Sequence, residues 1–421
     1  MTGFKAKIFV DQKPIFVLGI ILFITIAYFG WAKLQYGFPF VDEGFHMTES
    51  WRVAQGDSFI TGTKSGPAAG YNLINSMIFK ISPDITLLGF RKIQFLAAII
   101  ALLIFAVSLF KATREYWYFP YIFSLFAFTG LDPTGATSNL NYYTYPHLFL
   151  TLLIAFLVLG VCLNKEKLKM LAFILTGVFL WALSFTLLHL SICLMAPILI
   201  YAATRFLRLK DYRLEFKHLV LILVPFVLGW SIFLIVYNKI FFVSVFQLLQ
   251  DMQTSPSKSL TSLFSINLEA LKYIGLMGLL LGCFLSILRK FKLWVAYPAI
   301  ICLSILTHFI LDTSFFGMIN PYWKDWFSRP MWLAGLLIAF HIIYWLYTLK
   351  NLLKRKKLFH FEELTFCIML PSSIMFIGAS FISSFGLILV LHTAIPTTAV
   401  LTIFLLSHTQ VSLQSYWKTL P

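Results

Sequence analysis

Charged residues are scarce in this chain of 421 residues. Asp, Glu, Lys and Arg make up only 12% of it, whereas hydrophobic residues make up 59%. A soluble protein of this length would carry roughly twice that share of charge to cover its surface. The composition therefore excludes an ordinary soluble domain and predicts an integral membrane protein. The 45 Phe and 11 Trp residues suit a lipid-facing surface with aromatic belts at the membrane interfaces.

Motifs for metal and nucleotide binding are also missing. The nine histidines show neither HxxxH nor HExxH spacing, and the five cysteines form no CxxC pair; they lie in or beside apolar runs, at Cys162, Cys193, Cys283, Cys302 and Cys367. This pattern predicts neither a disulfide framework nor a zinc site, and no cofactor is expected. A glycine-rich nucleotide loop is absent as well. The net charge of +16 does not indicate nucleic acid, because the basic residues fall between apolar runs instead of forming one patch.

Twelve apolar runs are long enough to cross a hydrocarbon core, which needs roughly 20 apolar residues per helix. The predicted fold class is therefore an all-α integral membrane protein with about twelve transmembrane helices, forming a single domain over residues 1–421. A basic stretch precedes the first run but no small-residue cleavage site follows it, so this run is expected to remain as a helix. The expected spans are 14–35, 92–111, 116–132, 145–163, 170–187, 188–204, 219–241, 268–288, 293–311, 331–349, 364–382 and 386–407.

The distribution of Lys and Arg predicts the orientation of these spans. One set of alternate loops is rich in basic residues, as in 205–217 and 350–357, and the other set is poor in them. The positive-inside rule then places the basic loops and both termini in the cytoplasm. All the long segments between spans fall on the outer side, where function is expected: 36–91, 242–267 and 312–329, with a shorter segment at 132–145.

The first outer loop, 36–91, opens with an acidic pair, Asp42 and Glu43, directly after the first span. Such a pair often only caps a helix or complements its dipole. Here, however, acids are scarce, and a carboxylate at a membrane boundary is a candidate functional group. The residues that follow predict a short amphipathic helix lying on the outer membrane surface and ending near Gly56, because four of them recur at helical spacing: Phe45, Thr48, Trp51 and Ala54.

A turn rich in small residues, 61–76, follows and leads into a second short helix. It carries Lys64 beside several glycines. A cation and backbone N–H groups in such a turn can hold a phosphate, and the alternative is an exposed lysine on a loop.

Together these residues resemble the membrane-embedded glycosyltransferases of the GT-C class. The nearest likeness is to the branch that contains the protein O-mannosyltransferases and the undecaprenyl-phosphate aminoarabinose transferases. Three features carry the resemblance: the acidic pair with the helix that ends in Gly56 and Asp57, the turn and helix at 64–76, and the topology with one large first outer loop. Two features depart from the family pattern. In the family's turn a lysine and a proline lie together, whereas here two residues separate Lys64 from Pro67. Many relatives also carry an outer C-terminal domain after the last span, whereas only a short segment follows the last predicted span in this sequence.

The resemblance implies an enzyme that transfers a sugar from a polyprenyl-phosphate donor to a lipid, glycan or protein acceptor on the outer face of a membrane. It assigns Asp42 as the general base or the residue that orients the acceptor, and Lys64 as a contact of the donor phosphate. Further candidate cations for that phosphate are Arg91, Lys324 and Arg329. The Lys, Ile and Phe content and the lack of a retention signal favour a bacterial inner membrane.

Other polar residues have two interpretations each. Glu43 and Asp132 are candidate second acids, although Asp132 also suits a turn at 131–135. A divalent cation on these acids or Asp42 is an alternative to a metal-free site. A third group would contact sugar or acceptor, or else belong to the aromatic belt: Tyr71, Asn139, Tyr142 and Tyr143.

Three other classes of function fit parts of the pattern. A secondary transporter would also have about twelve spans, but it usually shows repeated broken spans and buried charges, which are not evident here. A polysaccharide polymerase or ligase would share the donor lipid, but it would more often place a long arginine-rich loop late in the chain. A scaffold role is the third alternative.

Overall fold

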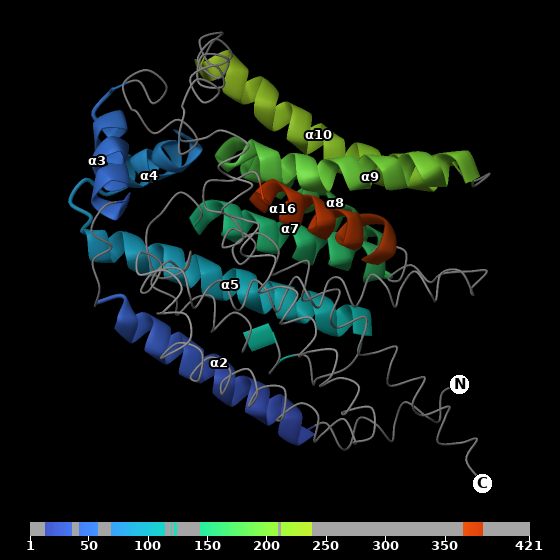
Figure 1. Cartoon of the computed structure of the whole chain (residues 1–421), viewed down its shortest axis with the longest axis horizontal. Coiled ribbons are helices and arrows are strands. Elements are labelled where there is room, and N and C mark those ends of the chain that lie inside the picture. The colour runs from blue at the N-terminus through green and yellow to red at the C-terminus, as the bar shows by residue number, and fades with distance from the viewer. Residues whose placement is uncertain are drawn as a thin grey trace, which may run out of the picture. The chain divides into compact units, whose positions relative to one another are not determined.

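The computed structural model describes residues 13–35, 42–57, 69–113, 119, 122–123, 144–208, 212–237 and 365–381. Every regular element among them is a helix. The chain divides into two compact units, one formed by 1–254, 358–372 and 406–421, and the other by 255–357 and 373–405. The helices α2 to α10 described below all belong to the first unit (Figure 1).

Five helices in the described ranges are long and apolar enough to cross a membrane. They are α2 (Lys13–Lys33), α5 (Leu87–Thr113), α7 (Thr144–Cys162), α8 (Glu166–Thr186) and α10 (Tyr212–Tyr237). Shorter apolar stretches lie in α9 (Leu188–Arg208), and in the π-helical turn η5 (Thr365–Met369) with α16 (Leu370–Phe381). These helices indicate an integral membrane protein, as the composition predicts.

Seven of the twelve predicted spans coincide in position with these helices. The predicted division between 170–187 and 188–204 is confirmed, because Leu187 has an extended backbone (φ −145°, ψ 93°) between α8 and α9. The spans predicted at 268–288, 293–311, 331–349 and 386–407 lie outside the described residues, as does nearly all of 116–132.

The start of α5 differs from the prediction. The helix begins at Leu87, five residues before the predicted span at 92–111. Thr86 caps this end, since its hydroxyl oxygen accepts a hydrogen bond from the Gly89 N–H at 3.1 Å. Arg91, which was predicted in the preceding loop, therefore lies on the first turns of α5, as Lys92 does.

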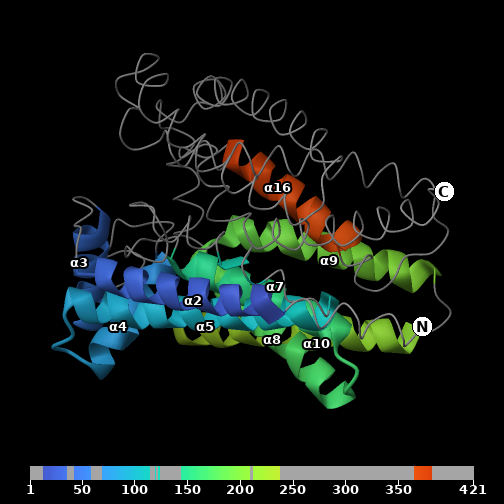
Figure 2. The ribbon, with the colours of Figure 1, turned by 90° about the horizontal axis from the view of Figure 1, so that it is seen from below.

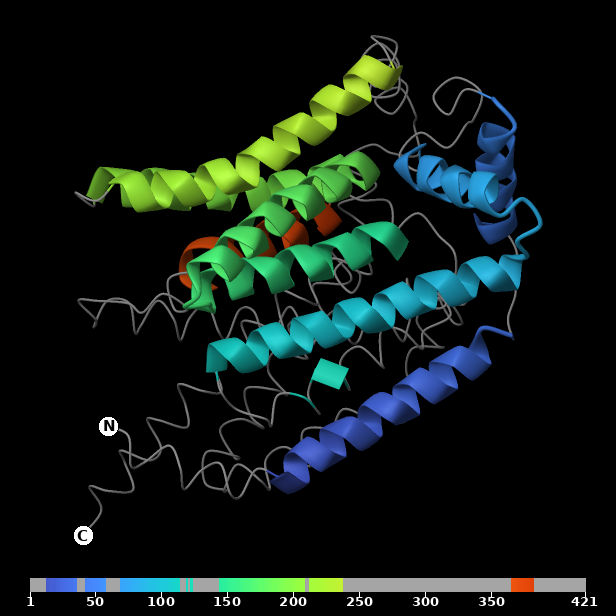
Figure 3. The same ribbon diagram turned by 180° about the vertical axis from the view of Figure 1, so that it is seen from behind.

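The long helices of the first unit pack as neighbours in chain order. α7 lies between α5 and α8, and α10 packs against α8. α2 lies beside α5, as Figures 2 and 3 show. Large hydrophobic side chains on α2, α5 and α10 remain exposed in the isolated chain, as expected of lipid-facing surfaces.

The contact between α8 and α10 requires a glycine at position 177. A Cβ atom on Gly177 would lie 2.1 Å from the carbonyl oxygen of Ile222 in α10, which is far shorter than a van der Waals contact. Replacement of Gly177 by alanine is therefore expected to push the two helices apart and to destabilise the fold by about 1–3 kcal/mol. The midpoint of thermal unfolding of the purified protein in detergent measures this loss.

The control for this prediction is Gly44→Ala on another helix, because a Cβ atom there meets nothing within 4 Å among the described residues. Gly44→Ala is expected to leave the midpoint unchanged or slightly raised, since alanine favours a helix more than glycine does. Equal midpoints for Gly177→Ala and wild type would contradict the close contact between α8 and α10.

Two short helices precede α5. They are α3 (Asp42–Ala54) and α4 (Ala69–Ile81), which pack against each other. In Figures 1 and 3, α3 runs across the direction of α5 instead of along it. The helix predicted after the acidic pair is confirmed, and Gly56 follows it with a positive φ of 113°.

In α3 large apolar side chains are exposed and polar side chains are buried, the reverse of an ordinary amphipathic helix in water. Phe45 and Trp51, on the side of the helix that was predicted to be apolar, are 48% and 49% exposed. The opposite side of the helix is turned into the protein and is largely polar: Glu43, His46, Glu49 and Ser50. Buried polar groups need partners, and these partners define the candidate site.

Candidate functional site

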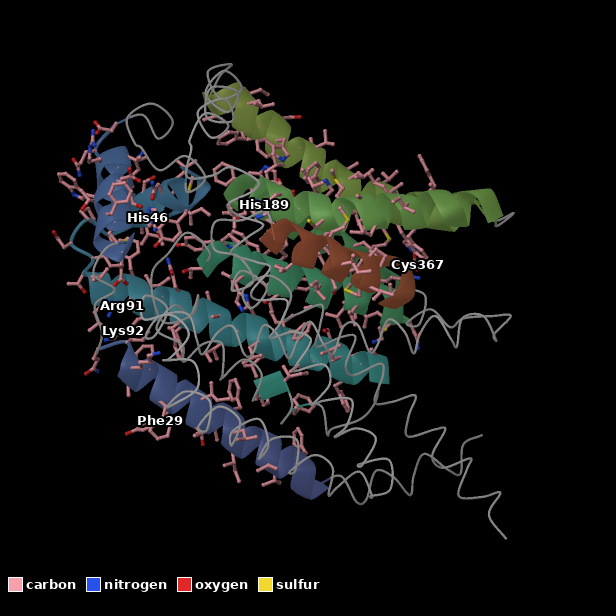
Figure 4. The ribbon with its side chains drawn as sticks, viewed as in Figure 1. Phe29, His46, Arg91, Lys92, His189 and Cys367 are labelled. Carbon is pink, nitrogen blue, oxygen red and sulfur yellow. The ribbon has the colours of Figure 1, made fainter. Side chains whose placement is uncertain are left out.

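A buried ion pair joins the beginnings of α3 and α5. The Arg91 Nε donates to Glu43 Oε1 at 2.7 Å, and its Nη2 donates to the other carboxylate oxygen. Its Nη1 donates to the carbonyl oxygen of Leu34, directly after α2, at 2.9 Å. Glu43 is fully buried and Arg91 is 6% exposed. One guanidinium therefore links the end of α2, the start of α3 and the start of α5. Figure 4 labels Arg91 at the start of α5.

This ion pair has the geometry that makes a buried charge tolerable. Desolvation of two charges is costly unless they are paired and their remaining hydrogen-bonding groups are satisfied. A bidentate contact between a guanidinium and a carboxylate is the strongest and most directional form of such a pair. The start of α3 is thus held in a fixed position beside the ends of two membrane-spanning helices.

A second set of polar contacts joins α3 to α4. The Asn72 Nδ2 donates to Glu49 Oε2 at 2.8 Å. The Ser50 hydroxyl lies 3.1 Å from Asn72 Oδ1 and 2.6 Å from the carbonyl oxygen of His46, and its single proton serves either acceptor. The Nδ1 of His46 lies 4.0 Å from Glu49 Oε2. All four side chains are buried, so these contacts fix how α3 packs on α4.

A third set joins α4 to α5 and α7. The Asn75 Oδ1 accepts hydrogen bonds from the Tyr145 hydroxyl at 2.7 Å and from Gln94 Nε2 at 3.4 Å. The ring of Tyr71 packs between those of Tyr145 and His46, with centroid distances of 5.4 and 5.7 Å. The polar faces of α3 and α4 are therefore continuous with polar residues on both neighbouring spans.

Tyr71 lies at the centre of this region. Burial raises the pKa of Tyr71 well above its usual range; the neighbouring Tyr145 and Glu43 add to this effect, and the Asn75 and Gln94 side chains partly oppose it. The phenol is therefore protonated at neutral pH and is able to donate a hydrogen bond. Although its hydroxyl lies beside Asn75 and Gln94, it makes no hydrogen bond to any of the described residues.

Replacement by phenylalanine is expected to change the stability of the fold differently at the two tyrosines. Tyr145→Phe removes a buried hydrogen bond to Asn75 and is expected to destabilise the fold by about 0.5–1.5 kcal/mol. Tyr71→Phe removes a buried hydroxyl that is without a bond in the described part of the chain, so no loss, or a small gain, is expected. Thermal unfolding midpoints of the two variants, measured side by side, test the difference. A loss for Tyr71→Phe as large as that for Tyr145→Phe would contradict it.

Three predicted site residues have side chains in the described structure, and they come together at one end of α5: Glu43, Arg91 and Tyr71. Asp42 is the first residue of α3, and its side chain lies outside the described part. The other predicted site residues also lie outside the described residues: Lys64, Asp132, Asn139, Tyr142, Tyr143, Lys324 and Arg329.

Several polar residues of the site were not predicted from the sequence: His46, Glu49, Asn72, Asn75, Gln94 and Tyr145. A signal for them exists, since Asn72, Asn75 and Ser76 recur at helical spacing on α4 and are all buried. Lys92, beside Arg91, points elsewhere; its Nζ lies 5.4 Å from the centroid of the Trp31 ring. Adjacent basic residues on α5 thus have different surroundings.

The described residues contain no group of three or more His, Cys, Asp or Glu side chains close enough to hold a metal ion. No family model, no curated protein and no solved structure matches this chain. The resemblance to the GT-C class therefore stays a prediction, and the function is argued from the residues and the geometry.

Proposed function

We propose that this chain is a membrane glycosyltransferase of the GT-C type, which transfers a sugar from a polyprenyl-phosphate donor to an acceptor. In this proposal it lies in a bacterial inner membrane with both termini in the cytoplasm, and the site at the start of α3 faces outward. One observation supports it most: the buried ion pair of Arg91 and Glu43 holds the start of α3, and with it Asp42, beside the ends of α2 and α5. A lipid-linked donor would present its phosphate and sugar at that level.

The ion pair changes the roles expected of two residues. Both carboxylate oxygens of Glu43 accept hydrogen bonds from Arg91, and all three guanidinium nitrogens of Arg91 donate to Glu43 or Leu34. Glu43 is therefore better suited to position its neighbour than to act as a second catalytic acid. Arg91 likewise serves as a positioning residue, which leaves Lys64, Lys324 and Arg329 as the proposed cations for the donor phosphate.

The proposed reaction has a single displacement at the anomeric carbon. Asp42 accepts the proton of the acceptor hydroxyl or amine, and the acceptor oxygen or nitrogen forms a bond to the anomeric carbon. The bond from that carbon to the phosphate oxygen breaks, and polyprenyl phosphate leaves with the electron pair. A positioned base contributes about 10²–10⁴-fold to such a step. Since a helix N-terminus favours the carboxylate anion, Asp42 also orients the acceptor by accepting its hydrogen bond.

The test is transfer of label from donors of known structure. Membranes that contain the full-length chain, and matched membranes without it, receive polyprenyl phosphates that each carry one radiolabelled sugar. A labelled lipid, glycan or protein found only with the chain would support the proposal and would identify the acceptor class. If no donor gives more product than the matched membranes, the glycosyltransferase proposal fails and the transporter, polymerase and scaffold alternatives move ahead.

A further inference from the structure

The short helix α4 buries three polar residues, whereas part of its aliphatic surface is exposed. Asn72, Asn75 and Ser76 are almost completely buried. Four aliphatic side chains follow the spacing i, i+3, i+4 and i+7, which places them on one face of the helix: Ile74, Met77, Ile78 and Ile81. The face is partly covered at Ile74 and Ile78, which pack against the buried cluster of Met47, Tyr71, Phe90 and Tyr145.

The C-terminal half of this face is open. Met77 is 50% exposed and Ile81 is 85% exposed, so a large aliphatic side chain at the end of α4 has almost no protein around it in the described chain. Exposed aliphatic side chains that follow one another along a helix face indicate an interaction surface more than ordinary scatter of apolar residues. Among the described residues, this C-terminal half of the face therefore stays uncovered.

The position of this face indicates which partner covers it. Only five residues, 82–86, separate α4 from the membrane-spanning helix α5, and they span at most about 18 Å when extended. They are in fact folded into a turn, since the Ser82 N–H donates to the Ile78 carbonyl oxygen and the Ile85 N–H to that of Ser82. Ile81 therefore lies close to the start of α5.

The exposed surface of α5 indicates where this helix would contact lipid. Along α5 an exposed aliphatic stripe begins at Ile93, two turns from the start of the helix, and continues through Leu96, Ile100, Leu103 and Val107. Its spacing of three and four residues marks one continuous helix face, as expected for a surface in contact with lipid. Only the five residues 82–86 separate the exposed end of α4 from the helix that carries this stripe.

We propose that Met77 and Ile81 insert into the membrane interface next to the start of α5, so that α4 lies on the lipid as an anchor. Lys80 is exposed on the last turn of α4, where its ammonium can reach the lipid phosphates while its stem lies along the apolar surface. This anchor would hold α4, and through Asn72 and Asn75 the polar site, at a fixed depth.

The test places a nitroxide spin label at one position at a time in the full-length chain, in bilayers of phosphatidylcholine and phosphatidylglycerol. Variants Met77→Cys and Ile81→Cys carry the label at the proposed anchor. Ile100→Cys on α5 serves as the lipid reference, and Gln55→Cys, at an exposed polar residue after α3, serves as the water reference. Labelling of the parent chain, which has five cysteines, gives the background to subtract.

The readout is relaxation of the label by oxygen, which concentrates in lipid, and by a water-soluble nickel chelate. Labels at Met77 and Ile81 are expected to be reached by oxygen more readily than by nickel, as at Ile100, with Gln55 showing the reverse. Nickel access equal to that at Gln55 would overturn the proposal by placing the face in water. Low access to both reagents would overturn it in favour of a protein cover. The result does not depend on sugar transfer, so it stands or fails separately from the proposed function.

Discussion

Replacement of Arg91 by methionine is expected to destabilise the protein by about 3–5 kcal/mol, because it removes the cation that contacts both oxygens of the buried Glu43 carboxylate. It also removes the hydrogen bond to the carbonyl oxygen of Leu34. The end of α2 and the starts of α3 and α5 would lose their common partner. The thermal unfolding midpoint of the purified protein in detergent, together with the fraction that elutes as a single species, measures the effect.

The neighbouring lysine provides a matched control. Lys92→Met makes a comparable change one residue further along α5, where the cation only lies over the Trp31 ring, an interaction that contributes about 0.5–1 kcal/mol at an exposed site. The double variant Arg91→Met with Glu43→Met is expected to recover much of the lost stability, since it leaves neither charge buried alone. If Arg91→Met is as stable as Lys92→Met, the ion pair does not hold these helices together.

Replacement of Asp42 by asparagine is expected to lower sugar transfer by about 10²–10⁴-fold while leaving the unfolding midpoint unchanged. Asparagine keeps the size of the side chain and can still cap a helix, but it cannot accept the acceptor's proton. The rate is measured with the labelled donor that the wild-type chain uses, at matched protein abundance. This pattern differs from that of Arg91→Met, which is expected to lose stability and activity together.

The matched control for Asp42 is Asp57→Asn. Asp57 lies just beyond the other end of α3, where it is exposed and accepts a hydrogen bond from Arg52 at 2.7 Å. Surface ion pairs of this kind contribute little, so wild-type transfer and stability are expected for Asp57→Asn. Should Asp42→Asn transfer sugar as fast as Asp57→Asn, Asp42 would be a helix cap and its proposed catalytic role would be wrong.

The positions of the described helices were largely predictable from the sequence. A membrane-spanning helix must satisfy its own backbone hydrogen bonds and present about 20 apolar residues to lipid, and both requirements are local. Runs such as 14–35 and 145–163 therefore match α2 and α7 to within about two residues. The helix after the acidic pair was also predictable, because its periodicity and Gly56 lie within one short segment.

The candidate site was predictable only in part. The acidic pair pointed to the start of α3, but the sequence could not show that Glu43 would pair with Arg91, which lies 48 residues away. Nor could it show that α5 starts early enough, at Leu87, to place Arg91 inside a helix. The predicted span was ended at Arg91 because a charged residue usually lies outside the hydrocarbon core. Here Arg91 lies within the helix because Glu43 pairs with it.

Which face of each short helix is buried depended on tertiary structure as well. The sequence alone determined that this chain is built of apolar helices and that α3 and α4 are two-sided, since both follow from composition and periodicity. Periodicity gives two faces but does not say which one is covered. The polar faces are buried because Asn72, Arg91 and Tyr145 supply hydrogen bonds from other helices, and such partners exist only once the chain has folded.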